Sequence, residues 1–168
     1  MEIALVGTHD SLTNEFDSFL VDDLPRLWRL FESADIIVGY NSEHFDIHIL
    51  NRYYPGDLTK IKSLDLLKEV YAVLGRRLKL DAIAEATIGE HKSAHGLQSL
   101  KWWREGKVEL VREYCLKDVD ITKKIFDFAL KHKTLKYKEL GKVKEVQLNT
   151  SRWLDSTQTA AMTQTLGF

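Results

Sequence analysis

The segment Ile36-Ile37-Val38-Gly39-Tyr40 constrains the fold more than any other stretch of the chain. It is apolar on both faces of an extended backbone, a pattern typical of an interior and often parallel strand. Two shorter segments, residues 3–8 and 16–21, are joined by a turn around residues 10–14 and predict an antiparallel hairpin before it. Together with the helices that follow, this order predicts an α/β domain with a mixed sheet.

Helices are predicted on both sides of this strand in the sequence. One opens at Asp22-Asp23-Leu24-Pro25, where the acids lie in the first turn and the proline needs no amide hydrogen. Ser42 is predicted to cap the next helix, at residues 43–54 before Pro55. The segment from Asn149 onward is rich in Ser, Thr and Gln, which predicts a tail that is poorly ordered or docks loosely. Further helices are expected at residues 64–74, 80–88, 97–104 and 109–131.

The length and composition of the chain favour one soluble domain. Its 168 residues, 44% of them hydrophobic, suffice for one core and are too few for two ordinary domains. No apolar run approaches the ~20 residues that a membrane span requires. Residues 1–7 lack the features of a signal peptide, and the lone Cys115 cannot form an internal disulfide, so a reducing cytoplasm is the expected location.

The net charge of −1 conceals an asymmetry between two parts of the chain. Residues 1–57 carry a balance of −8, and residues 58–168 carry a balance of +7. A basic part can follow a phosphate backbone while an acidic part gathers divalent cations, although solvated surface charge of this kind is common. The charge pattern is therefore compatible with a nucleic-acid partner without requiring one.

Two aspartates lie on helical faces that are otherwise apolar. Asp118 is the only charge on its face of the predicted 109–131 helix, and Asp46 shares a stripe with Ile49 and Leu50. A buried carboxylate is costly unless it is paired, hydrogen-bonded or bound to a metal. No Lys or Arg lies on either stripe, so Mg²⁺ or Mn²⁺ is the natural partner. A salt bridge or a helix cap is the alternative for each residue.

Several other residues have both a functional and a structural interpretation. Tyr114 lies one turn before Asp118 and can orient a metal-bound water or act as a core aromatic. Asp65 and Asp81 can contribute carboxylates or cap helices. His44 and His48, like His91 and His95, have a spacing that suits zinc, but a surface location is favoured because no further ligands accompany them. Phosphate contacts are predicted for Lys92, Lys101, Arg104 and Lys107, and base stacking or core packing for Trp102 and Trp103.

Two motifs resemble those of a known superfamily. The segment Asn41-Ser42-Glu43-His44-Phe45-Asp46 resembles the second motif, N-x3-F-D, of the DEDD 3′-5′ exonucleases, which have an RNase H-like fold. The segment from Tyr114 to Asp118 resembles the third motif, Y-x3-D, of the tyrosine subclass. The residues around Ser63-Leu64-Asp65 and the turn from Gly89 to Lys92 are similar to predicted exonucleases related to the proofreading domain of family B DNA polymerases. The resemblance covers residues 1–140 and leaves 141–168 as a C-terminal tail.

The resemblance implies a two-metal phosphodiester hydrolase that acts on DNA or RNA 3′ ends with Mg²⁺ or Mn²⁺. It implies that Asp118 binds the hydrolytic metal, that Asp46 supports the second metal through water, and that Tyr114 orients the nucleophile. Asn41 and Phe45 would shape the floor under the terminal nucleotide. A non-catalytic module that keeps the fold and binds nucleic acid or protein is the alternative.

The first motif of that superfamily, D-x-E, is absent from the chain. The resemblance places it on a first central strand between the hairpin and the strand at residues 35–40. The sequence therefore predicts an RNase H-like mixed sheet, flanked by helices, that lacks this strand. A late start codon, a shortened chain and a natural remnant are the explanations considered, and we favour a truncated gene or fragment. A partner chain that donates the strand is a further expectation, and so is poor or absent hydrolysis.

Overall fold

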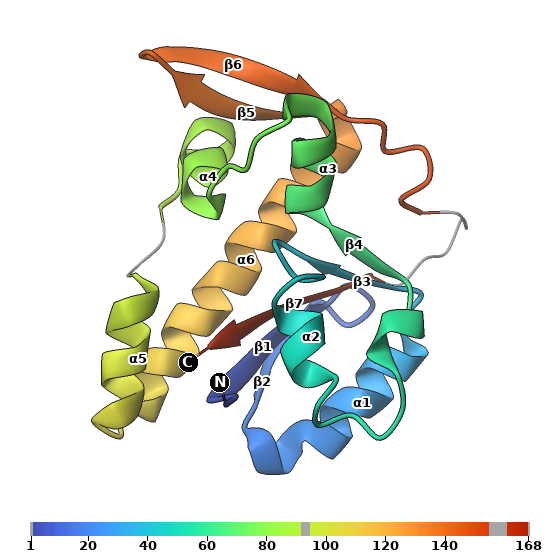
Figure 1. Ribbon diagram of the computed structural model, residues 1–168, viewed down its shortest axis with the longest axis vertical. Helices are drawn as coiled ribbons and strands as arrows, with labels where there is room; N and C mark the ends of the chain where they lie inside the picture. Colours follow the sequence, from blue (N-terminus) through green and yellow to red (C-terminus); the bar gives the residue numbers. More distant parts are fainter. Residues whose placement is uncertain (1, 92–94, 155–160, 168) are drawn as a thin grey trace.

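The computed structural model describes residues 2–91, 95–154 and 161–167, so the predicted phosphate contact Lys92 lies outside the described residues. Its centre is a five-stranded mixed sheet in the order β2-β1-β7-β3-β4 (Figure 1). The predicted α/β class with a mixed sheet flanked by helices is confirmed. The strands of this sheet are β1 (Leu5–Asp10), β2 (Glu15–Phe19), β3 (Ile36–Gly39), β4 (Ser63–Asp65) and β7 (Ala161–Gly167).

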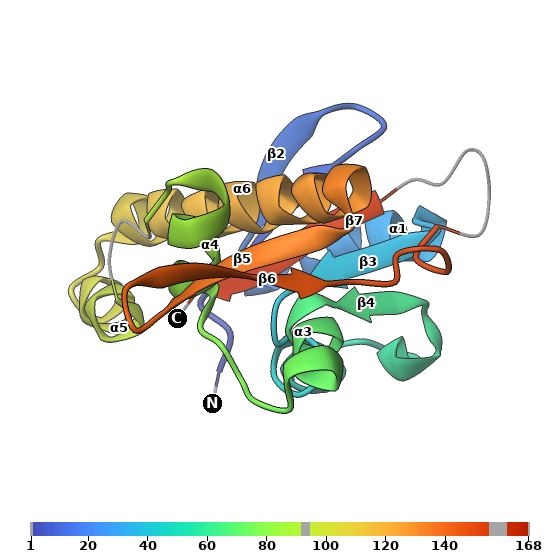
Figure 2. The ribbon, with the colours of Figure 1, turned by 90° about the horizontal axis from the view of Figure 1, so that it is seen from above.

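Helices flank the sheet, and the long α6 runs along one side of it (Figure 2). None of the described helices is both long and apolar enough to cross a membrane. Two short 3-10 turns, Val21–Asp23 and Leu58–Lys60, join other elements. The helices are α1 (Leu24–Ser33), α2 (Asp46–Leu50), α3 (Leu66–Leu74), α4 (Leu80–Ile88), α5 (Gly96–Arg104) and α6 (Val108–His132).

The strand β7 is the main departure from the sequence prediction. It pairs antiparallel with β1, where Val6 faces Leu166, and parallel with β3, where Val38 faces Thr163. Residues 161–167 of the expected tail are thus a central strand and not a loosely docked end. The physical reason is that a strand between two others satisfies its backbone donors and acceptors on both sides, which a threonine-rich segment does well.

The position that β7 occupies is the one expected to be missing. It lies between the hairpin of β1 and β2 and the interior strand β3. The sheet is therefore closed by residues of the same chain, and a partner chain is not needed to fill the gap. The strand differs from the expected one in its side chains, because it carries Thr163, Gln164 and Thr165 and no carboxylate.

Two further predictions of secondary structure are corrected. Residues Ser63–Asp65 pair in parallel with β3, so the helix predicted from residue 64 begins at Leu66. The helix predicted for residues 43–54 is shortened to Asp46–Leu50 and has no side-chain cap. Ser42 was the predicted cap, but its hydroxyl oxygen is buried and has no hydrogen-bond partner among the described residues, while its carbonyl accepts from the amide of Ile47.

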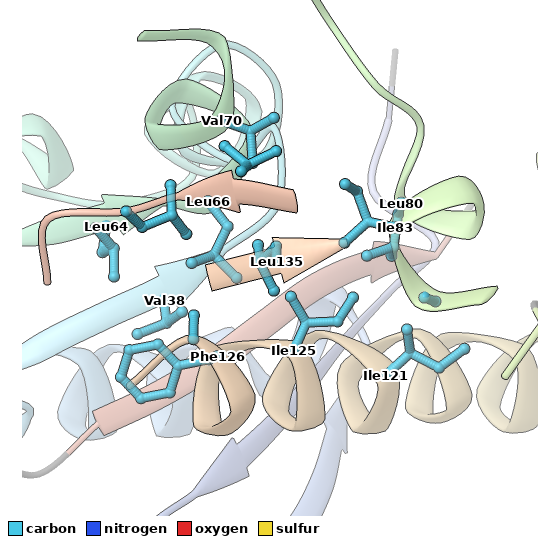
Figure 3. Packing of buried hydrophobic residues seen from close by; sticks show 14 of the residues in the cluster. Val38, Leu64, Leu66, Val70, Leu80, Ile83, Ile121, Ile125, Phe126 and Leu135 are labelled. Atoms are coloured by element: carbon cyan, nitrogen blue, oxygen red, sulfur yellow. The ribbon is translucent and has the colours of Figure 1, made fainter. Parts of the chain in front are cut away.

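Apolar clusters fill both faces of the sheet. On one face, Val38 packs with Leu66, Ile83 and Ile125, and the hairpin of β5 (Thr134–Glu139) and β6 (Lys142–Gln147) closes this cluster through Leu135 (Figure 3). The other face carries a cluster built from α1, α2 and alternate strand residues. Its members include Val6, Leu27, Phe31, Ile37, Leu50 and Leu166. Since neighbouring residues of a strand point to opposite faces, α6 and α2 lie on opposite sides of the sheet.

Candidate functional site

The loop that follows β3 is held by the carboxylate of Asp65. The amide of Asn41 donates to Asp65 Oδ1 at 2.8 Å, and the amide of Glu43 donates to Oδ2 at 3.1 Å. The same carboxylate caps α3, since the amide of Leu67 donates to Oδ1 at 3.0 Å. Asn41 has a φ of 61°, a left-handed conformation that asparagine tolerates better than most residues. The capping interpretation of Asp65 is confirmed, and the residue also shapes the loop.

We expect Asp65→Ala to lower the free energy of unfolding by about 2–4 kcal/mol, because it removes a helix cap and leaves loop amides without an acceptor. Urea unfolding followed by circular dichroism measures this loss. Asp57→Ala is the matched control, since Asp57 caps only the exposed turn Leu58–Lys60. Equal losses for the two variants would show that Asp65 is an ordinary cap.

Asp46 is buried at the first position of α2 and contacts β7. Its exposed fraction is 6%, and the side-chain amide of Gln164 donates to Asp46 Oδ2 at 3.2 Å. Gly39 lies beside this pair. A Cβ at residue 39 would lie 2.6 Å from Ser42 Oγ and 3.2 Å from Gln164 Nε2, so only glycine leaves room for this contact. An amide thus occupies one oxygen of the carboxylate that was expected to support a metal.

Asp118 is buried on the apolar face of α6, as the sequence predicts. Its exposed fraction is 6%, and α6 buries the stripe that includes Tyr114, Cys115 and Ile121. Together with Asn41 and Thr165, Asp118 lines a cavity of about 630 Å³. The helix α6 therefore brings one carboxylate to a cavity that the loop after β3 and the strand β7 also line.

The buried thiol of Cys115 is affected by both carboxylates. Burial raises the pKa of Cys115, and the carboxylates of Asp118 and Asp46 raise it further. The thiol also donates to the carbonyl oxygen of Thr165 at 3.5 Å. Both carboxylates therefore act electrostatically on the same buried thiol, although their helices lie on opposite faces of the sheet.

The strand β7 presents different side chains to the two faces. Thr165 pairs with Gly7, and a Cβ at Gly7 would lie 3.0 Å from Cys115 Sγ, so both residues face α6. Thr163, two residues earlier, faces the same side, whereas Gln164 points toward α2 and Asp46. The spacing of Thr163 and Thr165 equals that of the two acids in D-x-E, but hydroxyls stand in place of carboxylates.

A family model of the RNase H superfamily matches residues 3–130, which run from β1 through most of α6. The chain belongs to the RNase H superfamily. No curated protein and no solved structure matched the chain significantly. The matched region holds Asp46 and Asp118 and ends before the β5–β6 hairpin and β7. The strand that completes the sheet therefore lies outside the part of the chain that carries the family pattern.

Domains of the RNase H superfamily typically use divalent metals, but the residues of this chain do not fit a two-metal centre. Among residues 2–91, 95–154 and 161–167, no group of three or more His, Cys, Asp or Glu is placed to hold a metal ion. Gln164 directs an N–H, which cannot bind a cation, at Asp46. Thr163 and Thr165 are neutral, so β7 adds no carboxylate beside Asp46 and Asp118.

Of the other predicted residues of this RNase H superfamily chain, Asn41 and His95 line the same cavity. Tyr114 is buried one turn before Asp118, and Phe45 is half-buried at the start of α2, against the α1 and α2 cluster. Asn41 Oδ1 accepts from Arg77 Nη2 at 2.6 Å. The side chains of His44, His48, His91 and His95 are exposed, as the surface interpretation expects.

Sequence reasoning missed Arg77 and Lys79, which line the cavity beside Asn41 and Asp118. Both follow the end of α3, where Gly75 takes a left-handed φ of 72° and ends the helix. The signal that was available is a run of basic residues directly after a glycine stop. Its position next to Asn41 depends on a contact between residues 36 apart in the sequence.

Proposed function

We propose that this chain is a DEDD-type 3′-5′ exonuclease domain of the tyrosine subclass that binds the 3′ end of single-stranded DNA or RNA and hydrolyses it poorly or not at all. The motifs at residues 41–46 and 114–118 support the lineage. The observation that carries the proposal is the hydrogen bond from Gln164 to Asp46. It supports weak or absent hydrolysis, because the strand facing this proposed metal ligand supplies a neutral amide and no further carboxylate. We also propose a cytoplasmic location, in which the buried Cys115 stays reduced.

The residue assignments belong to the same proposal. Asp46 and Asp118 are the remaining half of a site for Mg²⁺ or Mn²⁺, and Tyr114 lies where it can orient a nucleophile. Asn41 and Phe45 are proposed to form the floor under the terminal nucleotide, and Lys92 to contact phosphate. Because the acids of the first motif have no counterpart on β7, no hydrolytic step is assigned to the chain as it stands.

A non-catalytic binding module is the second candidate, and the same contact favours it. Two neutral hydroxyls and an amide on β7 hold the site without the charge repulsion that four carboxylates would produce. The first candidate allows slow metal-dependent hydrolysis of the 3′ end, whereas the second allows none.

We expect the purified chain to bind a single-stranded 3′ tail with an affinity that falls as salt rises, and to leave the tail uncut in the presence of Mn²⁺. Fluorescence anisotropy measures the binding, and gel electrophoresis of the end-labelled strand measures the cutting. Arg77→Ala should weaken binding about tenfold, since it removes a cation beside Asn41.

Arg76→Ala is the matched control, because Arg76 is adjacent but is paired with Glu139 at 3.4 Å. Rapid Mn²⁺-dependent digestion that Asp118→Asn abolishes would overturn the proposed loss of hydrolysis. Absence of binding at low salt would overturn the proposed nucleic-acid partner.

A further inference from the structure

Two cavities each adjoin a central cavity at the candidate site. The central one, of about 630 Å³, contains Asp118 and Thr165. A smaller cavity of about 290 Å³ shares Asn41 and Arg77 with it and extends to Tyr71. A third cavity, of about 780 Å³, shares His95 and Gly96 with the central one and extends along α5; its lining includes Leu97, Leu100, Trp103 and Arg104. We call these three cavities together the track.

An aromatic side chain lies at each end of the track. Tyr71, on α3, is 50% exposed. Burial of its ring would stabilise the fold, so the exposed half of the ring is surface available to a ligand. Trp103, on α5, is half-buried against the cluster of Leu5, Val111 and Cys115, which holds its ring in place. Leu97 beside it is 83% exposed. A flat apolar surface that is fixed on one side and open on the other suits the stacking of a nucleobase.

Cations without carboxylate partners lie between and beside these aromatic residues. Within the described parts of the chain, no carboxylate lies within ion-pair distance of Arg77, Lys79 or Arg104, and all three are exposed. By contrast, Lys101 on the same helix as Arg104 is paired with Glu105 at 3.9 Å. Unpaired guanidinium and ammonium groups along a cavity are suited to phosphate, which guanidinium groups bind in a bidentate geometry.

We propose that the track binds several successive nucleotides of one strand, with bases stacked on Tyr71 and Trp103 and phosphates bound by Arg77, Lys79 and Arg104. This inference rests on the proposed function and adds contacts on either side of Asp118. Because every base has a π-face, the stacking tolerates any sequence. A single strand fits the combination of stacking surfaces and cations, since the bases of a duplex are already stacked on one another.

The test compares the Kd of a single strand of about twelve nucleotides, a length within the usual range of single-strand sites, for wild type and variants. Tyr71→Ala and Arg104→Ala each weaken binding about tenfold, and Trp103→Leu does the same while it keeps apolar packing. Arg104→Ala also lowers the slope of log K against log salt by about 1, whereas Tyr71→Ala leaves the slope unchanged.

The control variants are Val73→Ala on α3 and Lys144→Ala on β6, where Lys144 is paired with Glu139 at 2.7 Å. Val73 is 53% exposed and lies outside the lining of all three cavities, so its change leaves Kd within about twofold of the wild-type value. If wild type binds and the three track variants behave like these controls, the track is refuted while the proposed function stands. If wild type binds no strand at all, the proposed function fails and the track with it.

Discussion

Gln164→Glu is expected to destabilise the chain at neutral pH by about 2–4 kcal/mol and to create a site at which Mn²⁺ restores the loss. The substitution keeps the size of the side chain and exchanges an N–H donor, 3.2 Å from Asp46 Oδ2, for a second carboxylate. Two buried like charges raise the pKa of the pair, so one proton is retained in the folded state. Hard oxygen ligands and two negative charges then favour a divalent cation.

The pH dependence has a definite sign. The pair in the folded variant has a pKa above the unfolded value of about 4, so the folded state holds more protons above that pH. Below about pH 4 the charge pair therefore costs the variant no stability, and only the loss of the hydrogen bond remains. Its free energy of unfolding falls as pH rises from about 4 toward the folded pKa. Guanidinium unfolding at acidic and neutral pH, with and without Mn²⁺, measures both effects.

Two further variants separate charge from packing. Gln164→Met removes the hydrogen bond without adding a charge. The stability that it loses should therefore not vary with pH through a second carboxylate at residue 164, and Mn²⁺ should not restore it. Asp46→Asn combined with Gln164→Glu leaves one carboxylate and should also lose the response. A Gln164→Glu chain that is as stable as wild type at neutral pH, and indifferent to Mn²⁺, would show that Gln164 does not lie against Asp46.

Removal of residues 161–168 is expected to abolish cooperative folding. The strand β7 joins β1 to β3, and its loss would leave two interior strands with unpaired backbone groups and open the cluster around Leu166. The cost exceeds the 5–15 kcal/mol by which domains are typically stable. Thermal unfolding by calorimetry should show no transition for the shortened chain.

A point variant tests the same strand in a chain that still folds. Leu166→Ala should cost about 2–4 kcal/mol, because Leu166 is buried against Val6. Leu140→Ala is the control, since Leu140 is 97% exposed at the tip of the β5–β6 hairpin and its loss should change little.

For the chain that lacks residues 161–168, a melting temperature equal to that of wild type would mean that these residues do not belong to the sheet.

The parts of the site that the sequence predicted depend on short-range patterns. The 109–131 helix is observed as Val108–His132, and Asp118 is buried on the face that its apolar neighbours define. The position of Asp46 follows in the same way from the residues around it. Helical periodicity and caps depend on residues a few positions apart, so they can be predicted from a single sequence. The role of Asp65 as a helix cap could be predicted for the same reason.

The parts that the sequence did not predict depend on pairings between distant residues. Gln164 and Asp46 lie 118 residues apart in the chain, and nothing in the segment from Asn149 onward resembles an interior strand. The strand β4 was missed because its three residues run directly into α3. Such pairings are decided by which backbone edge remains open after the rest of the sheet has formed, a property of the assembled fold.

The sequence alone determined that two aspartates would be buried on helices of an α/β domain, because apolar stripes and strand patterns are local. Only the tertiary structure decided what faces those aspartates. The open edges of β1 and β3 pair with the backbone of β7, and this pairing does not require carboxylates on β7. The strand therefore completes the sheet and places Thr163, Gln164 and Thr165 at its centre, with Gln164 against Asp46. Local sequence patterns cannot predict this arrangement, because it depends on pairing between distant segments.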